Sequence, residues 1–462
     1  MTRLRRLSIW LIVLCCVFSV ISGVALDSAS AAGTTNFRAV YYGARCLIRH
    51  TDPYNPTDFL RLYREESGEF PQDPNKALLF IRAVPVCVNL PTTLLLVTPF
   101  AWLAWGLARL LWLALIAVVF TSAALCAWDL ASDYAPKVSV VLICLLAANS
   151  QVLFIVGNTA ALAVGLCVAA VWCFARGRFV FAGVACLAIS LAIKPHDSGL
   201  VWLYFVLASS AYRKRAFQSL TLAVVLAAPA VLWVSAIAPQ WRQELRSNLA
   251  ETSRHGDISD PGPDNMSRRG SADVLINLQT VVSVFHDEPL VYNVASFLIC
   301  GSLLAIWSLK TLRSETSPAH MWLALATVAA LSLLPLYHRP YDAKLLMLSV
   351  PGCAWLWSRG GLAGRLALVL TTAAVLATGD IPLAFLARLF SHLEVHSMSF
   401  GEKLLTLPLL RPAPVVLLTL SGFFLWRYSQ FTNAEEIKAD RSAREQAREF
   451  HSQEGSNRIR HW

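Results

Sequence analysis

Charge is scarce in this sequence. Only 15% of its 462 residues are Asp, Glu, Lys or Arg, whereas a soluble domain averages about a quarter. Hydrophobic residues make up 56% and the mean hydropathy is +0.54, which is more apolar surface than a soluble core hides. The length alone would fit two or three soluble domains. The composition excludes them and predicts an all-α polytopic membrane protein.

Several motifs are also missing. No GxxxxGK[ST] loop occurs, which argues against an ATP-driven pump, and no internal repeat is visible, unlike in many secondary transporters. The eleven cysteines form no CxxC and no zinc-type spacing with histidine. Most of them lie in apolar stretches, where they are expected to pack as small apolar side chains. Cys46 and Cys87 lie in a polar region and could form a disulfide.

The net charge of +10 raises the question of nucleic-acid binding. The positive residues lie in short clusters between apolar stretches, as the positive-inside rule predicts for a membrane protein. We therefore expect a lipid bilayer, and no nucleic acid, as a partner of this chain.

Twelve stretches are predicted as membrane crossings, because a spanning helix needs about 20 apolar residues. The first follows three arginines and is expected to be retained. A cleaved signal peptide is the alternative, because small residues come after it. The predicted crossings are residues 7–26, 85–105, 107–128, 158–175, 179–195, 198–212, 216–238, 290–309, 320–337, 343–358, 362–380 and 404–426.

A further apolar stretch, 138–156, ends just before Gly157. A full crossing here would put Arg176 and every later basic cluster outside. We therefore predict that this stretch enters the membrane and returns to the same side, which is tolerated where protein surrounds the backbone. The result is about 12 crossings plus one re-entrant segment in the inner (plasma) membrane, with both termini in the cytoplasm.

Polar segments complete the expected architecture. The transmembrane unit covers residues 1–426. It includes a first outer loop at 27–84, with short interfacial helices, and a second outer loop at 239–289 that is rich in turn residues. The charged tail, 427–462, is expected to be a solvated cytoplasmic helix or disordered.

Ionisable residues at membrane depth are costly and mark functional sites by default. Three polar clusters fall on the expected outer side. In the first, Arg38, Tyr42 and Arg45 share one helical face and could bind an anionic group. An amphipathic interfacial helix, with arginines that reach the lipid headgroups, explains this pattern equally well.

The other two clusters lie at the ends of apolar stretches. Lys194-Pro195-His196-Asp197 has three ionisable residues in four, and Lys194 could hold a phosphate; a lysine that merely reaches the interface is the alternative. Residues 337–344 contain His, Arg, Asp and Lys, which can supply a general base, a phosphate clamp and an orienting carboxylate. An ordinary polar loop is the alternative there. Spacing indicates no metal site, although a carboxylate near a phosphate could hold Mg²⁺ or Mn²⁺.

Four short motifs follow one another along the chain. They are Phe37-x-x-x-Tyr41-Tyr42-x-Ala44-Arg45 with Asp52-Pro53-Tyr54, then Gly157-Asn158, then Lys194-Pro195, and last Tyr337-His338-x-x-Tyr341-Asp342. In this order the chain resembles glycosyltransferase family 87, membrane enzymes of the C-type glycosyltransferase fold that use polyprenyl-phosphate mannose. The resemblance covers roughly residues 7–380. No motif carries it alone.

The resemblance implies a polyprenyl-phosphate-linked sugar donor, typically mannose, and a lipid or glycan acceptor. It places the active site on the outer face of a bacterial plasma membrane. An inverting transfer needs a base for the acceptor hydroxyl and cations for the leaving phosphate. The implied phosphate-binding residues are Arg38, Arg45, Lys194 and Arg339, the implied catalytic residues are His338, Asp342 and Asp52, and Tyr41, Tyr42, Asn158, His196 and Tyr341 complete the substrate-binding set.

One position departs from the family pattern. The usual catalytic aspartate of the family stands immediately before the Phe-x-x-x-Tyr stretch, and this chain has Asn36 there. An amide cannot act as a base near neutral pH. Either the base has moved to His338, Asp52 or Asp27, or the protein is an inactive relative that binds or moves lipid-linked sugar. A secondary transporter is the third alternative.

Overall fold

The computed structural model describes a helical protein. Helices and loops account for all described residues, and no strand occurs among them, which confirms the predicted all-α class. Most of the predicted charged tail lies outside the described residues. The described ranges are 3–28, 34–66, 70–263, 265, 275–314, 317–389 and 397–431.

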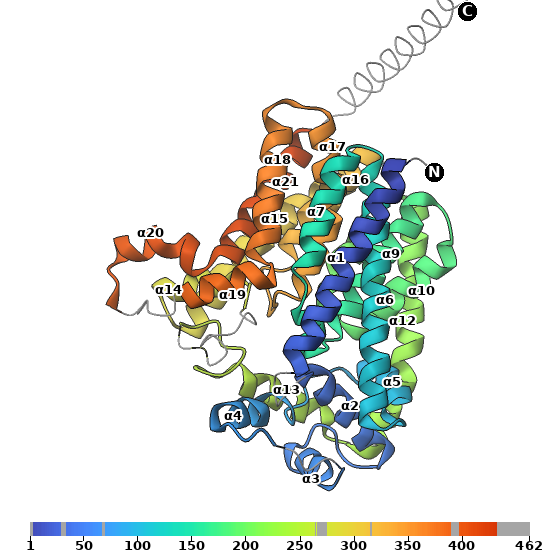
Figure 1. Cartoon of the computed structure of the whole chain (residues 1–462), viewed down its shortest axis with the longest axis vertical. Helices are drawn as coiled ribbons and strands as arrows, with labels where there is room; N and C mark the ends of the chain where they lie inside the picture. Colours follow the sequence, from blue (N-terminus) through green and yellow to red (C-terminus); the bar gives the residue numbers. More distant parts are fainter. Residues whose placement is uncertain are drawn as a thin grey trace, which may run out of the picture.

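The helices form three groups (Figure 1). The long bundle contains α1 (Arg3–Ser28), α6 (Trp105–Ser132), α7 (Pro136–Ala148), α8 (Val152–Val156), α9 (Ala160–Arg176), α10 (Val180–Ile193), α11 (Pro195–Leu207), α12 (Ser210–Ile237), α15 (Pro289–Arg313), α16 (Pro318–Leu331), the 3₁₀ helix η2 (Asp342–Leu348), α17 (Ser349–Ser358), α18 (Gly361–Ala377) and α21 (Pro412–Gln430). One end of the bundle carries α2 (Thr35–Ile48), α3 (Pro56–Glu66), α4 (Pro74–Ala83), α5 (Pro91–Ala101) and α13 (Trp241–Thr252). A side arm carries α14 (Gln279–Phe285), α19 (Asp380–Leu389) and α20 (Phe400–Leu410).

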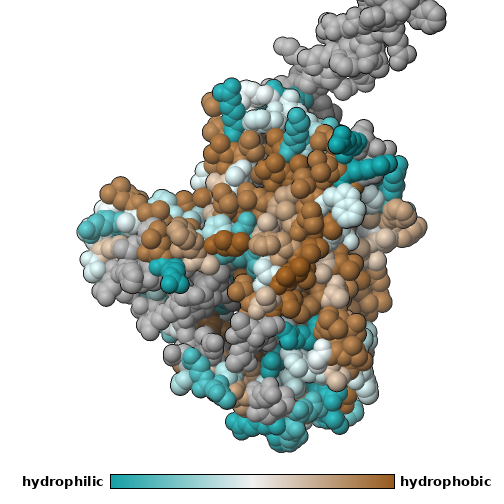
Figure 2. Space-filling view, viewed as in Figure 1, coloured by the Kyte–Doolittle hydropathy of each residue, from teal (hydrophilic) through white to brown (hydrophobic). Residues whose placement is uncertain are grey.

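The bundle has the surface of a membrane protein. Within the described ranges, five helices are long and apolar enough to cross a membrane, or up to seven if each of two bent pairs counts as one span. Apolar side chains cover the middle of the bundle, and hydrophilic ones gather at the end that carries α3 and α4 (Figure 2). Outward-facing residues such as Val118, Leu232 and Leu298 are 64%, 71% and 66% exposed. Lipid explains such exposure. The predicted number of twelve crossings is not confirmed by this count.

The stretch predicted to be re-entrant runs through the bundle instead. At its start, Asp133 pairs with Arg176 at 2.6 Å. At its far end, the carbonyl of Ile155 accepts a hydrogen bond from Thr34 N at 2.9 Å, where the first outer loop enters α2. Residues 136–156 also qualify as one candidate span. The prediction for 138–156 was wrong because the polar break after α7 bends the path without reversing it.

The stretch predicted to cross at 85–105 does not cross. Its helix, α5, has 11 residues, and about 1.5 Å of rise per residue leaves it far short of a membrane core of about 30 Å. It packs on α2, and Thr93 Oγ1 donates to the carbonyl of Ile193 at 3.1 Å. Residues 136–156 therefore qualify as a candidate span, whereas 85–105 does not. The basic residues stay together, as Arg215 shows by donating to the carbonyl of Phe174, near the Arg176 end of α9, at 3.2 Å.

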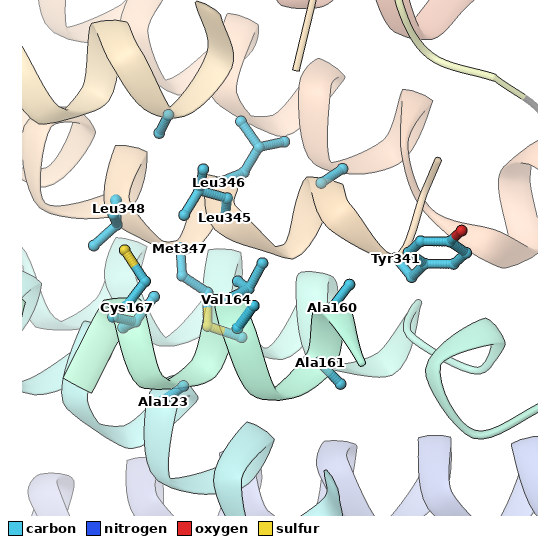
Figure 3. Packing of buried hydrophobic residues seen from close by; sticks show 14 of the residues in the cluster. Ala123, Ala160, Ala161, Val164, Cys167, Tyr341, Leu345, Leu346, Met347 and Leu348 are labelled. Atoms are coloured by element: carbon cyan, nitrogen blue, oxygen red, sulfur yellow. The ribbon is translucent and has the colours of Figure 1, made fainter. Parts of the chain in front are cut away.

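The 3₁₀ helix η2 is held by close packing against α9 (Figure 3). Leu345 and Met347 of η2 are fully buried. The side of α9 that faces η2 presents the small residue Ala160, which lets the two backbones approach. This packing fixes the position of Asp342, the first residue of η2.

Gly157 allows a close approach between α8 and the start of α2. Its φ is +61°, and an added Cβ would lie 2.6 Å from Thr34 Cγ2 and 2.9 Å from Phe37 Cβ. Gly177 has nearly the same backbone, with φ of +64°, but an added Cβ there would meet nothing within 4 Å. Comparing alanine substitutions at the two glycines therefore distinguishes the cost of a left-handed backbone from the cost of a steric clash.

We expect Gly157→Ala to destabilise the protein more than Gly177→Ala. Both variants put a side chain in the left-handed region, at a cost of about 1–2 kcal/mol, and only Gly157→Ala adds overpacking of about 1–3 kcal/mol. Thermal unfolding of the detergent-solubilised variants measures the difference. Equal melting temperatures would contradict the close contact between Gly157 and the start of α2.

Candidate functional site

The candidate site forms where two apolar stretches are interrupted. Pro195 cannot continue α10, because it lacks an N–H and clashes with the preceding turn, but it suits the first position of α11. Lys194 lies between the two helices. Residues 332–341 connect α16 to η2 on the other side of the site. The two interruptions meet, since Lys194 Nζ donates to Asp342 Oδ1 at 2.6 Å.

Lys194 is shared between two carboxylates. Its Nζ lies 2.6 Å from Asp342 Oδ1 and 3.7 Å from Asp197 Oδ2. It also lies 5.2 Å from the centroid of the Tyr341 ring, a cation–π distance. Asp342 is 0% exposed and Asp197 is 1% exposed. The group therefore places one ammonium between two buried carboxylates.

Two imidazoles flank Asp197. His338 Nε2 lies 3.3 Å from Asp197 Oδ1, and His196 Nε2 lies 3.5 Å from the same oxygen. The two rings meet edge to face, with centroids 5.2 Å apart. The Nδ1 atom of His338 lies 3.1 Å from the carbonyl oxygen of Leu336. Asp197 is thus the centre of a His–Asp–His group in which Asp197 and His338 are buried and His196 is half-buried.

Residues of the predicted second outer loop pack over this group. Arg339 Nη2 donates to the carbonyl of Ile258 at 2.7 Å, and Arg339 Nε donates to the hydroxyl of Tyr337. The backbone N–H of Arg339 donates to Asp342 Oδ2 at 2.8 Å. The carbonyl of His338 accepts from Ile276 N at 3.0 Å. These contacts hold the loop around Arg339 in one conformation.

Six of the predicted site residues come together with Asp197, and we call this set the junction cluster. Two cations, two carboxylates and two imidazoles at one largely buried place can hold a phosphate and move a proton. The junction cluster consists of Lys194, His196, Asp197, His338, Arg339, Tyr341 and Asp342.

The arginines predicted in the first loop have structural partners. Arg38 Nη1 donates to the Tyr63 hydroxyl at 2.7 Å, and its guanidinium lies 4.8 Å from the Trp105 ring. Arg45 Nε donates to both oxygens of Glu66, at 2.9 and 2.8 Å. These contacts attach α2 to α3 and α6.

Tyr41 and Tyr42 belong to the same assembly. The Tyr41 hydroxyl donates to the carbonyl of Leu103 at 2.7 Å. The Tyr42 ring packs against Tyr41 at 5.0 Å and against Tyr63 at 4.9 Å between centroids. Both tyrosines are buried. The described contacts that these four first-loop residues make with other elements involve α3, α4, α5, α6 and the α5–α6 turn, and none of them involves the junction cluster.

The remaining predicted residues lie at turns. Asp52 Oδ1 accepts from Tyr54 N at 2.8 Å, in a local turn. Burial and the neighbouring Asp52 carboxylate raise the pKa of Glu244 to about 7. Asn158 Oδ1 accepts from Ala160 N at 2.8 Å and supports the start of α9. Asn36 lies half-buried in the first turn of α2.

Asp27, an alternative base, is already engaged. Its carboxylate accepts from Thr34 N at 2.6 Å and from Thr34 Oγ1 at 2.8 Å, and it pairs with Arg109. These contacts fix the chain that enters α2. Cys46 and Cys87, which could have formed a disulfide, are both free buried thiols.

Asp197 is the functional candidate that the sequence prediction left out of its site residues. The sequence prediction includes the motif Lys194-Pro195-His196-Asp197 but assigns binding only to Lys194 and His196. The adjacent His196 and Asp197 were the feature of the sequence that could have indicated Asp197 as a site residue. Its place between two imidazoles depends on His338, which is far away in sequence, and only the folded chain brings the two together.

Comparison with known proteins identifies the family. The model of Glycosyltransferase family 87 matches residues 88–336, which is more than half of the 462-residue chain. That range includes Lys194, His196 and Asp197 and ends just before His338. No curated protein and no solved structure matches the chain. The chain belongs to glycosyltransferase family 87.

Proposed function

We propose that this membrane glycosyltransferase moves a hexose, with mannose as the first candidate, from a polyprenyl-phosphate donor to a lipid or glycan acceptor at the outer face of the plasma membrane. Family membership supports a glycosyltransferase in the membrane. The observation that carries the specific proposal is the junction cluster. It combines Lys194 and Arg339 with the His–Asp–His group around Asp197.

The positive charges of Lys194 and Arg339 match the negative charge of the phosphate leaving group. In the proposed transfer, the acceptor oxygen bonds to the anomeric carbon while the bond from that carbon to the phosphate oxygen breaks. The polyprenyl phosphate leaves with the electron pair. Lys194 and Arg339 would hold its developing charge, because preorganised cations in a water-poor site stabilise such charge strongly.

We assign the activation of the acceptor hydroxyl to the His–Asp–His group around Asp197. Asn36 cannot supply a base, Asp27 is bound by Thr34 and Arg109, and Asp342 is bound by Lys194. The acceptor hydroxyl would lose its proton beside Asp197, and the oxygen freed on the polyprenyl phosphate would take the proton up. Atoms and charge balance without any further reactant.

A reconstituted transfer assay tests the proposal. Protein in liposomes receives polyprenyl-phosphate [¹⁴C]mannose and a membrane lipid extract, and labelled product is followed. We expect transfer by the wild type and a loss of about 10²–10³-fold in Arg339→Ala, as for removal of one charge-stabilising donor. The control is Arg254→Ala, because Arg254 pairs with Glu251 on the surface and is 71% exposed at its side chain.

A second candidate is a catalytically inactive relative that binds or moves lipid-linked sugar, and Asn36 favours it. The same assay separates the two. Label that stays on the donor in the wild type but reaches an acceptor in Asn36→Asp would support the inactive relative. Equal transfer by wild type and Arg339→Ala would refute the assigned site.

A further inference from the structure

Four buried polar atoms of the junction cluster face one another without making hydrogen bonds. They are His196 Nε2, His338 Nε2 and the two carboxylate oxygens of Asp197, and among the described residues none of them has a hydrogen-bond partner. His338 is 0% exposed and Asp197 is 1% exposed. Unsatisfied polar groups in such a place destabilise the folded protein. Something that binds all three side chains would remove that cost.

The distances fit a metal ion. Each side chain offers one ligand atom, and the three atoms lie within 4.8 Å of one another. The two contacts with Asp197 Oδ1 measure 3.3 and 3.5 Å. Ligands about 2.0–2.1 Å from a tetrahedral ion are separated by about 3.3 Å. Two of the three separations therefore already match tetrahedral coordination.

The orientation of His338 also fits a ligand. Its Nδ1 lies 3.1 Å from the Leu336 carbonyl oxygen, which can only accept a proton. A hydrogen bond from Nδ1–H fixes the tautomer and leaves the Nε2 lone pair directed at Asp197. Metal-binding histidines almost always have such an outer partner on their other nitrogen.

The charges of the junction cluster balance before an ion binds. Asp342 lies beside Asp197, and Lys194 is the ammonium that contacts both carboxylates. Lys194 approaches Oδ2 of Asp197, whereas both imidazoles approach Oδ1. With neutral imidazoles, Lys194 and Arg339 balance the two carboxylates, so the junction cluster carries no net charge, and Oδ1 of Asp197 stays available to an ion.

We infer that His196, Asp197 and His338 bind a divalent transition-metal ion of the Zn²⁺ type. Two imidazoles and one carboxylate are ligands for Zn²⁺ and its neighbours in the first transition series, whereas Mg²⁺ prefers oxygen ligands. Three protein ligands leave the fourth position open.

The role of the ion rests on the proposed function. An acceptor hydroxyl bound at the fourth position would become more acidic, as metal-bound water does. The proton would go to the departing phosphate, as above. The ion would then supply the activation that the family's aspartate supplies and Asn36 cannot.

Metal content tests the binding without any activity assay. Untagged protein is purified without chelator, its metals are measured by inductively coupled plasma mass spectrometry, and the chelator-stripped protein is titrated with Zn²⁺, Mn²⁺ and Mg²⁺. We expect about one Zn²⁺ per chain and weak Mg²⁺ binding. His196→Asn and His338→Asn should each weaken Zn²⁺ binding more than about 100-fold, beyond the loss that an outer partner causes. His286→Asn, at an exposed histidine that pairs with Glu288, should keep it.

Cobalt gives a second readout on the wild type that does not depend on how the variants fold. Co²⁺ in a tetrahedral nitrogen–oxygen site gives strong visible bands, and Co²⁺ in an octahedral surface site gives weak ones. Weak bands, or equal Zn²⁺ affinity in wild type and His338→Asn, would overturn the inference. Undiminished transfer by the metal-free enzyme would overturn the role of the ion and leave the proposed transfer intact. Zn²⁺ binding without transfer would refute the proposed function alone.

Discussion

Replacing Asp197 with asparagine is expected to lower hexose transfer by about 10²–10⁴-fold, the range of a group that activates the nucleophile. The amide keeps the shape of the side chain but removes the charge that lies 3.3 Å from His338 Nε2 and 3.5 Å from His196 Nε2. Without this charge the two imidazoles lose their common partner. Lys194 keeps Asp342, so phosphate binding should survive and KM for the donor should change less than kcat.

The reconstituted transfer assay measures both constants. Asp58→Asn is the matched control, because Asp58 pairs with Arg61 on α3 and lies far from Asp197 in sequence. Thermal unfolding of both variants shows whether the fold is kept. An Asp197→Asn enzyme with transfer within threefold of wild type and an unchanged melting temperature would exclude Asp197 from the reaction.

The sequence predicted the composition of the junction cluster better than the position of the first-loop residues. Lys194 and residues 337–342 were predicted because ionisable groups at the ends of apolar stretches are unusual. Arg38 and Arg45 stood out for a similar reason. Their partners, which include Glu66, are invisible to helical spacing because they come from other helices. A polar helix face predicts that a partner exists, and it does not say whether that partner is a substrate.

The membrane path shows another limit of sequence patterns. The positive-inside rule constrains whether the number of crossings between two basic clusters is odd or even. A crossing at 85–105 with a re-entrant 138–156 satisfies it, and so does the observed path, in which α5 stays at one end and residues 136–156 cross. Both stretches are apolar. The packing of α5 on α2 decides between them, and hydropathy does not contain that contact.

The second large expected effect is on stability, and it concerns the helix break between α7 and α8, at residues 149–151. A helix interrupted inside a membrane protein leaves backbone groups that need partners, because lipid offers none. Lys344 Nζ donates to the Asn149 carbonyl at 2.7 Å, and Asp380 Oδ2 accepts from Val152 N at 2.7 Å. Lys344 Nζ and Asp380 Oδ1 are 3.7 Å apart, and both side chains are 4% exposed. One buried ion pair therefore satisfies both sides of the break.

We expect Lys344→Met to destabilise the protein by about 3–5 kcal/mol, because removing one partner of a buried ion pair leaves the other charge uncompensated. Lys344→Met/Asp380→Asn should be more stable than Lys344→Met, since it removes that charge and keeps an amide oxygen to accept from Val152. Contacting residues typically couple by about 0.5–3 kcal/mol. The melting temperatures of the two single variants, the double variant and wild type in detergent give the coupling.

Recovery of stability in the double variant would show that the uncompensated charge of Asp380, and not altered packing, destabilises Lys344→Met. Lys344 and Asp342 lie two residues apart in η2, so loss of stability alone could come from any damage to that helix. If the damage were only to packing, Asp380→Asn would add its own cost to that of Lys344→Met, and the double variant would be the least stable of the four. If the buried charge is the cause, the double variant melts above Lys344→Met. The order of two melting temperatures therefore decides whether this ion pair holds the broken helix next to the site.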